Sequence, residues 1–291
     1  MKFSKIEGFL KKTSTDENEL FFSIAQSGFP VYISSKLNPV FSLSCGNNKN
    51  KAVISTIPKS GTYLVGELLK HIGFELVKLN VRKNNIRDFR WADLNDFSNL
   101  GKTFPLHHLV QMILSGQVIA GHVEYDEYTK KSLLGFQKIF VYRNMRDALV
   151  SAMRHGEKWS VFSSDRENLR KREGPEKLLW YMNSTLCMNF LNTSNKVSGW
   201  FNDENTFKIS YENLLGDYGI EKRNQSIIQL FKFLNCEKNK KQIEKILDAT
   251  FSADTLTKSS KRTSNEKFWN DMVEKEFIKM GFKELNAKLG Y

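Results

Sequence analysis

The feature that most constrains the fold of this chain is an uncharged apolar run that stops at a proline and is soon followed by a helical pattern. Residues 52–57, AVISTI, form the run, and short runs of this kind are typical of parallel strands that are buried on both faces. From residue 64 to residue 72 apolar side chains recur at the helical spacing, and Gly73 suits the end of a helix. The stretch therefore predicts a buried strand, a short loop and a helix.

The same alternation continues along the chain. Short apolar runs that predict strands lie at residues 74–79, 117–122, 137–143 and 206–214. Helical patterns lie at residues 103–116, 145–155, 174–192, 225–235 and 241–251. Strands that alternate with helices predict an α/β fold, in which a parallel central sheet is flanked by helices on both faces. Ligands of such sheets bind at the carboxyl ends of the strands, which is where the loop after residue 57 lies.

The length of the chain bounds the number of domains. Its 291 residues are enough for one large α/β domain, and neither an internal repeat nor a long linker divides them. We therefore expect a single domain over residues 1–291. Residues 1–50 show only weak periodicity and predict a peripheral N-terminal segment with short strands.

The loop after the first strand has the composition of a phosphate-binding site. Its residues include Lys59, Ser60 and Gly61, and the helix begins near Thr62. The first amides of a helix lack internal acceptors and carry the positive end of the helix dipole. Gly61 allows the backbone to approach an anion closely, Lys59 adds a full charge, and the hydroxyl groups add donors. The alternative is an ordinary strand–helix turn with a chance lysine.

The loop differs from the Walker A pattern of P-loop nucleotide-binding proteins. That pattern places a lysine directly after its second glycine, whereas Lys59 precedes Gly61 and no glycine lies five residues before it. A P-loop-type small-molecule or nucleoside kinase remains the alternative function. It would require magnesium, and no clear set of aspartate ligands is visible in the sequence.

The sequence IPKSGTYL, residues 57–64, closely resembles the 5′-phosphosulfate loop of sulfotransferases that use 3′-phosphoadenosine 5′-phosphosulfate (PAPS). The resemblance implies a P-loop-like sulfotransferase fold. It also implies that residues 59–63, from Lys59 through Tyr63, bind the donor nucleotide. Lys59 would in addition stabilise the charge that develops on the leaving phosphate, as a fixed cation does in phosphoryl transfer.

A second motif resembles the element of this family that binds the 3′-phosphate of the nucleotide. The sequence VYRNMRDALVSAMRH, residues 141–155, places Arg143 at the end of a strand and Ser151 two helical turns later. The resemblance implies that Arg143 and Ser151 hold the 3′-phosphate, which suits the bidentate geometry of arginine. Met145 replaces a proline of the family pattern. For Arg146 a surface ion pair with Asp147 or a neighbour is the expected role.

A histidine directly after a strand resembles the catalytic histidine of the family. His122 follows the run QVIAG, at the same sheet edge as Lys59 and Arg143. A neutral imidazole can take a proton from an acceptor hydroxyl or amine, so the resemblance implies that His122 is the general base. The sequence departs from the family pattern on the acceptor side, where GHVEY stands in place of GHLPY. Glu124 could raise the pKa of His122, orient it, or do neither.

Two later elements match the family more loosely. The stretch KISYENLLGD, residues 208–217, resembles a segment whose tyrosine lies near the adenine, which would be Tyr211; the alternative is a tyrosine of the core. The basic residues Lys261 and Arg262 precede Trp269 and occupy the place of a loop that contacts the 3′-phosphate. The glycine of that loop is missing, and a solvated basic loop is the alternative.

The resemblance implies PAPS as the donor, with 3′-phosphoadenosine 5′-phosphate (PAP) as product, and no requirement for a metal. The implied acceptor is a hydroxyl or amine of a small molecule, such as one of secondary metabolism. The formal net charge of 44 − 32 = +12 suits an anionic nucleotide. Because no module that reads nucleic acid is visible, we expect no nucleic-acid partner.

The sequence also carries expectations about location and assembly. No apolar stretch approaches the roughly 20 residues needed to span a bilayer, and the N-terminal residues lack the apolar core of a signal peptide. We therefore expect a cytoplasmic protein with no membrane partner. A monomer and a homodimer both remain open.

Overall fold

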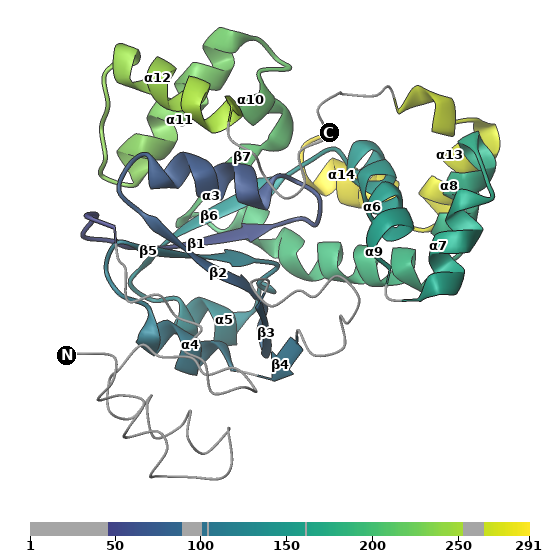
Figure 1. Ribbon diagram of the computed structural model, residues 1–291, viewed down its shortest axis with the longest axis horizontal. Coiled ribbons are helices and arrows are strands. Elements are labelled where there is room, and N and C mark those ends of the chain that lie inside the picture. Colours follow the sequence, from purple (N-terminus) through teal and green to yellow (C-terminus); the bar gives the residue numbers. More distant parts are fainter. Residues whose placement is uncertain (1–45, 89–100, 104, 161, 253–264) are drawn as a thin grey trace.

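The computed structural model describes residues 46–88, 101–103, 105–160, 162–252 and 265–291. Within these residues the centre of the molecule is a seven-stranded sheet in the order β4-β3-β2-β5-β1-β6-β7 (Figure 1). The strands are β1 (Lys51–Thr56), β2 (Glu75–Val81), β3 (Asn85–Asp88), β4 (Gly101–Thr103), β5 (Gln117–Gly121), β6 (Phe136–Tyr142) and β7 (Thr206–Ser210). The predicted central sheet is thereby confirmed.

The sheet is parallel in its centre and antiparallel at one edge. The strands β2, β5, β1, β6 and β7 pair in parallel, as the alternation of strands and helices predicts. The strands β3 and β4 add an antiparallel edge that the sequence did not reveal. Only residues 82–84 join β2 to β3, which is too short for the crossover that a parallel pair needs.

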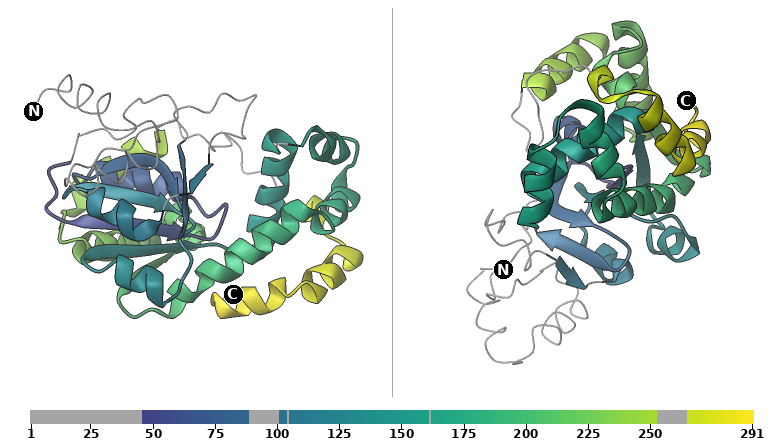
Figure 2. Two further views of the ribbon diagram at one scale, coloured as in Figure 1. Left: turned by 90° about the horizontal axis from the view of Figure 1, so that it is seen from below. Right: turned by 90° about the vertical axis from the view of Figure 1, so that its right-hand side faces the viewer.

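Helices cover both faces of the sheet (Figures 1 and 2). One face carries α3 (Thr62–Lys70), α10 (Tyr211–Leu215), α11 (Ile220–Phe233) and α12 (Lys240–Ser252). The opposite face carries α4 (Leu106–Met112) and α5 (Glu127–Ser132). The helices α6 (Met145–Trp159), α7 (Ser163–Arg170), α8 (Gly174–Met182), α9 (Thr185–Val197), α13 (Asp271–Lys279) and α14 (Phe282–Lys288) gather at one side of the sheet.

Alternating side chains of the central strands feed two separate cores. In β1, Ala52 and Ile54 pack with α3, α11 and α12, while Val53 packs into the core on the opposite face. Successive side chains of a strand point to opposite faces, so a strand that is apolar at every position must be covered on both. The absence of charge from residues 52–57 therefore reflects burial on two sides.

Two predicted elements end earlier than expected. The helix predicted over residues 174–192 is two helices, because Ser184 caps α9 by accepting a hydrogen bond from the amide of Cys187, at 3.4 Å. The strand predicted over residues 206–214 ends at Ser210, whose hydroxyl accepts from the amide of Asn213 at 3.1 Å and starts α10. Short polar side chains that bond to the backbone override apolar periodicity at both places.

Two sequence-based expectations meet the limits of the described residues. The short strands predicted between residues 31 and 45 lie outside them. Among the helices that the structure does describe, none is long and apolar enough to cross a membrane.

Candidate active site

The loop between β1 and α3 has a left-handed backbone at two positions. Lys59 has φ of 69° and Gly61 has φ of 89°. A side chain at Gly61 would be blocked, because its Cβ atom would lie 2.7 Å from the Tyr211 ring. No side chain caps the start of α3 at Gly61. Within the described residues the Gly61 cap therefore leaves the start of α3 without a capping side chain, and a helix N-terminus of this kind suits an anion.

Two buried donor atoms beside this loop have no partner among the described residues. They are the hydroxyl of Ser60 and the Nε atom of Arg143. Arg143 follows β6 and donates from Nη1 to the carbonyl oxygen of Lys59 at 3.1 Å, so the arginine is tied to the loop. An unpaired buried donor is costly, and such atoms are normally satisfied by water or by a ligand. Anionic oxygen atoms, from one group or from two, would satisfy both donors.

Tyr211 lies between the loop and the arginine. The Arg143 guanidinium stacks over the Tyr211 ring with 4.4 Å to the ring centre. The same ring limits the space at Gly61. The structure therefore brings together Gly61, Arg143 and Tyr211, which are far apart in the chain. The alternative, a tyrosine within the apolar core, does not match this position.

The charge on Lys59 is sensitive to its surroundings. Burial, and then the neighbouring Arg143 guanidinium, lower the pKa of Lys59 to about 8. A bound anion would offset both effects, since it would supply an opposite charge to each cation. The loop therefore contains a lysine whose charge an anionic ligand would stabilise.

His122 lies at the end of β5 with a fixed imidazole orientation. Its Nδ1 atom is 2.9 Å from the carbonyl oxygen of Thr56 and 3.2 Å from the Thr56 hydroxyl. A carbonyl oxygen only accepts, so in the neutral ring Nδ1 carries the proton and Nε2 carries the lone pair. The Thr56 hydroxyl also lies 2.8 Å from that of Thr62, at the start of α3. Thr56 thus connects His122 to Thr62, at the end of the β1–α3 loop.

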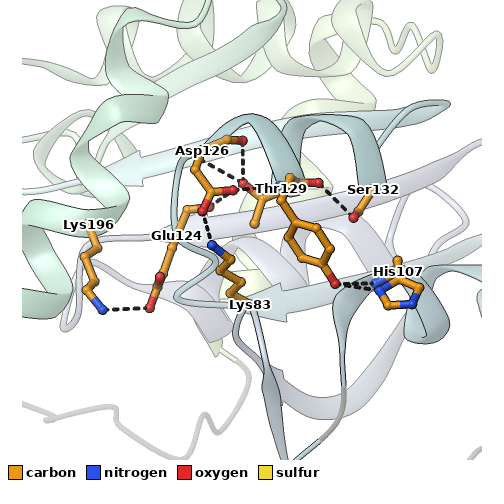
Figure 3. Close-up of polar contacts among 8 residues, drawn as sticks. Lys83, His107, Glu124, Asp126, Thr129, Ser132 and Lys196 are labelled. Atoms are coloured by element: carbon orange, nitrogen blue, oxygen red, sulfur yellow. Dashed lines mark hydrogen bonds and ion pairs between the residues drawn. The ribbon is translucent and has the colours of Figure 1, made fainter.

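The acidic side chains in the loop after His122 form ion pairs with lysines (Figure 3). Glu124 pairs with Lys196 at 3.3 Å, and Asp126 pairs with Lys83. Asp126 also caps α5 in a reciprocal arrangement with Thr129. The Glu124 carboxylate is thus paired with a lysine, whereas the Nδ1 atom of His122 is oriented by Thr56. Both carboxylates are therefore already paired within the protein.

His155, the last residue of the helix predicted over residues 145–155, was not singled out from the sequence as a site residue. It lies one turn before the end of α6, four residues after Ser151 and on the same side of that helix. Although the residue reaches solvent, partial burial, and then nearby Lys59 and Lys158, lower the pKa of His155 to about 4. Lys59 is thus one of the charges that act on the His155 imidazole. Its helical spacing from Ser151 was the available signal in the sequence.

The remaining predicted residues are less well placed or cannot be described. Tyr63 lies in the first turn of α3, and burial raises its pKa. Lys261 and Arg262 lie outside the described residues. Trp269, which follows them, stacks on Arg146, with 3.9 Å between the guanidinium carbon and the ring centre.

Arg146 has a structural role that differs in detail from the expected one. It pairs with Glu274 of α13, whereas Asp147 accepts from the Asn265 amide. The expected surface ion pair of Arg146 is therefore made with a neighbour in space. In the part of the chain that the structure describes, no group of three His, Cys, Asp or Glu side chains could hold a metal ion.

Comparison with known proteins identifies the class of protein that this fold and site define. Residues 49–284 match the family model of the sulfotransferase domain. The chain therefore belongs to the sulfotransferase family, and the identification made from its sequence motifs, a PAPS-dependent sulfotransferase, is confirmed at the level of the family. No curated protein matches the sequence.

The fold is also found among solved structures. Mouse sulfotransferase SULT7A1, complexed with PAP, is similar with a TM-score of 0.56 and 15% sequence identity. The similarity covers 95% of this chain and 94% of the mouse chain. At this identity the likeness concerns the fold, which is the one expected from the sequence.

Proposed function

We propose that this enzyme transfers a sulfuryl group from PAPS to a hydroxyl or amine of a small-molecule acceptor. The observation that carries the proposal is the pair of buried donors on Ser60 and Arg143 that have no partner among the described residues, with Arg143 bonded to the carbonyl oxygen of Lys59. A nucleotide with phosphate groups at both its 3′ and 5′ positions carries anionic oxygens at two places. The PAP in the related mouse structure supports this choice of nucleotide.

The proposed donor site has two ends. At the first, Ser60, the amides of residues 61–63 and the hydroxyl of Thr62 hold the 5′-phosphate, as the left-handed loop supports. At the second, Arg143 and Ser151 hold the 3′-phosphate. Arg143 contributes through its unpartnered Nε atom, and Ser151 through its position two turns into α6.

Three further residues complete the proposed donor site. Tyr211 packs near the adenine, which its position against Gly61 and Arg143 supports. The loop that contains Lys261 and Arg262 adds positive charge at the 3′-phosphate. The place of these two residues in the sequence, before Trp269, is the basis for this assignment.

PAPS supplies an activated sulfuryl group, whose bond to the 5′-phosphate breaks as the acceptor atom bonds to sulfur. His122 takes the proton of the attacking hydroxyl or amine at Nε2, since Nδ1 is held as a donor to Thr56. Lys59 stabilises the negative charge that passes to the 5′-phosphate of PAP. Residues of the chain thus serve both the proton and the leaving group.

We propose that transfer requires no metal, because Lys59 and Arg143 supply positive charge at the donor site. We also propose that the chain acts as a single domain in the cytoplasm, as a monomer or homodimer, on small molecules such as those of secondary metabolism. The acceptor side carries charges that are paired within the protein, which supports an acceptor without a large net charge.

The first test is calorimetric titration with PAP, ADP and 5′-AMP in buffer without magnesium. We expect PAP to bind much more tightly than 5′-AMP, because only PAP has a 3′-phosphate for Arg143. Equal affinity for the nucleotides would contradict the proposed donor. Binding of ATP that depends on magnesium would instead favour the kinase alternative, which no contact of the described residues supports.

A further inference from the structure

A buried glutamate lies behind the proposed 3′-phosphate site. Glu212 is only 6% exposed, and its Oε1 atom accepts a hydrogen bond from the amide of Asn144 at 3.1 Å. Its other oxygen, Oε2, accepts from the hydroxyl of Tyr291. The carboxylate thus joins two segments that lie 68 and 79 residues away in the sequence. A buried carboxylate of this kind depends on its donors, since each lost donor leaves charge unsatisfied.

The two ends of this contact are next to residues of the donor site. Asn144 directly follows Arg143 and caps α6, accepting from the amide of Arg146 at 2.9 Å. Glu212 directly follows Tyr211, on whose ring Arg143 stacks. The carboxylate therefore fixes the backbone beside both partners of that stack. Movement of either backbone would separate the guanidinium from the ring.

The segment that ends in Tyr291 holds the same turn through a second contact. Asn286 of α14 accepts from the amide of Met145 at 2.7 Å, and the Tyr291 amide donates to the Asn286 carbonyl at 3.1 Å. The Tyr291 ring also packs against Tyr142, with 6.0 Å between ring centres. Figure 1 shows α14 beside α6. The start of α6 is thus held from α10 and from the segment after α14.

Tyr291 is suited to a permanent donor role. Burial, followed by the hydrogen bond to Glu212, raises the pKa of Tyr291, so its hydroxyl keeps the proton that it donates. We define the Glu212 network as Asn144, Glu212, Asn286 and Tyr291.

We propose that Tyr291, acting through Glu212, is a positioning residue for the 3′-phosphate end of the nucleotide site. Its hydrogen bonds within the described residues go to Glu212 and Asn286, and it acts by holding the turn from which Arg143 extends. This inference rests on the proposed function, because it takes Arg143 as the group that binds the 3′-phosphate. It predicts an effect on recognition of that phosphate alone.

The test compares the affinities of PAP and 5′-AMP for the wild type and for Tyr291→Phe. The variant keeps the aromatic ring and removes only the donor to Glu212. We expect the affinity for PAP to fall about tenfold, which is typical of a lost hydrogen bond to a charged group. We expect the affinity for 5′-AMP to stay near the wild-type value, because 5′-AMP lacks the phosphate that Arg143 would hold. In turnover, the KM for PAPS should rise while kcat is retained.

Tyr218→Phe is the matched control. Tyr218 lies close enough to Glu212 for the carboxylate to affect its pKa, yet no hydrogen bond from its hydroxyl is found within the described residues. This control should keep the wild-type ratio of PAP to 5′-AMP affinity. If Tyr291→Phe also keeps that ratio, even with a lower melting temperature, the residue is only structural and the inference is wrong.

Glu212→Gln keeps the test decisive if Tyr291→Phe fails to fold. It preserves the shape of the side chain and removes its charge, so we expect the same selective loss of PAP affinity. An unchanged ratio in this variant would overturn the inference. If the wild type itself does not prefer PAP to 5′-AMP, the proposed function fails first, and this inference falls with it.

Discussion

The β1–α3 loop and the β5–α5 loop lie at the same edge of the sheet but differ in whether their polar side chains have partners within the protein. The β1–α3 loop leaves the Ser60 hydroxyl without a partner among the described residues, and the adjoining Arg143 leaves its Nε atom in the same state. The β5–α5 loop pairs Glu124 and Asp126 with lysines. Unsatisfied buried donors indicate a missing ligand, whereas paired charges indicate that the loop is already complete. This contrast is the reason for placing the proposed donor nucleotide at the β1–α3 loop.

The largest effect is expected for the replacement His122→Ala, which is the first test of this contrast. Removing a general base costs about 10²–10⁴-fold in rate, so turnover should fall by at least about 100-fold. PAP should still bind, because His122 is not among the residues proposed to hold either phosphate. Turnover assays and calorimetry on the same preparation would separate the two effects.

His107→Ala provides the control for that variant. His107, labelled in Figure 3, is exposed, and its Nδ1 atom lies 2.7 Å from the Tyr128 hydroxyl. Its replacement should leave kcat near the wild-type value. If His122→Ala keeps more than about a tenth of the activity, another group removes the proton.

The second prediction concerns pH and the donor loop. Because the pKa of Lys59 is about 8, the lysine is charged below that pH and loses its proton above it. Binding of an anion must then return the proton, so the affinity for PAP should fall as pH rises above 8, by up to about tenfold per pH unit. Calorimetry in buffers of different ionisation enthalpy should show no proton uptake at about pH 6.5 and uptake approaching one proton at about pH 9.

Lys59→Met separates this effect from other titrations. The variant should bind PAP more weakly at neutral pH, and its affinity should not change between about pH 7.5 and about pH 9. The second ionisation of a phosphate lies near pH 6, so the ligand does not titrate in this range. A variant that keeps the full pH dependence would show that a different group takes up the proton.

The smallest effect is expected in the acceptor-side loop. Glu124→Gln breaks a partly exposed ion pair with Lys196, and such pairs contribute about 0–1 kcal/mol. We expect kcat to change by less than about threefold, with the same pH profile as the wild type. A loss of more than about tenfold, together with a shifted pH profile, would show that Glu124 acts on His122 after all.

The sequence predicted those parts of the fold that local patterns encode. The run at residues 52–57 became β1, and the carboxyl ends of β1, β5 and β6 carry Lys59, His122 and Arg143. These residues follow directly from strands, so the rule for parallel sheets was sufficient to place them together. The two-helix form of residues 174–197 was missed, because the cap at Ser184 competes with an unbroken apolar pattern.

The contacts that depend on helix placement could not be predicted. Lys59 and His155 lie on different elements, and no local pattern in the sequence encodes the influence of one charge on the other. The hydrogen bond from Tyr291 to Glu212 joins residues 79 positions apart. The motif around Glu212 was visible in the sequence, but its partners were not, so the glutamate could be described only as structural.

The position of Thr56 has a consequence for how the acceptor specificity of this enzyme could change. The Thr56 carbonyl accepts the Nδ1 proton of His122, while its hydroxyl bonds to that of Thr62, the first residue of α3. The proposed base and the proposed donor site therefore share one residue at the end of β1, and a change at Thr56 would affect both. Substitutions in the walls around the site, made to accept a new acceptor, would leave this shared residue intact.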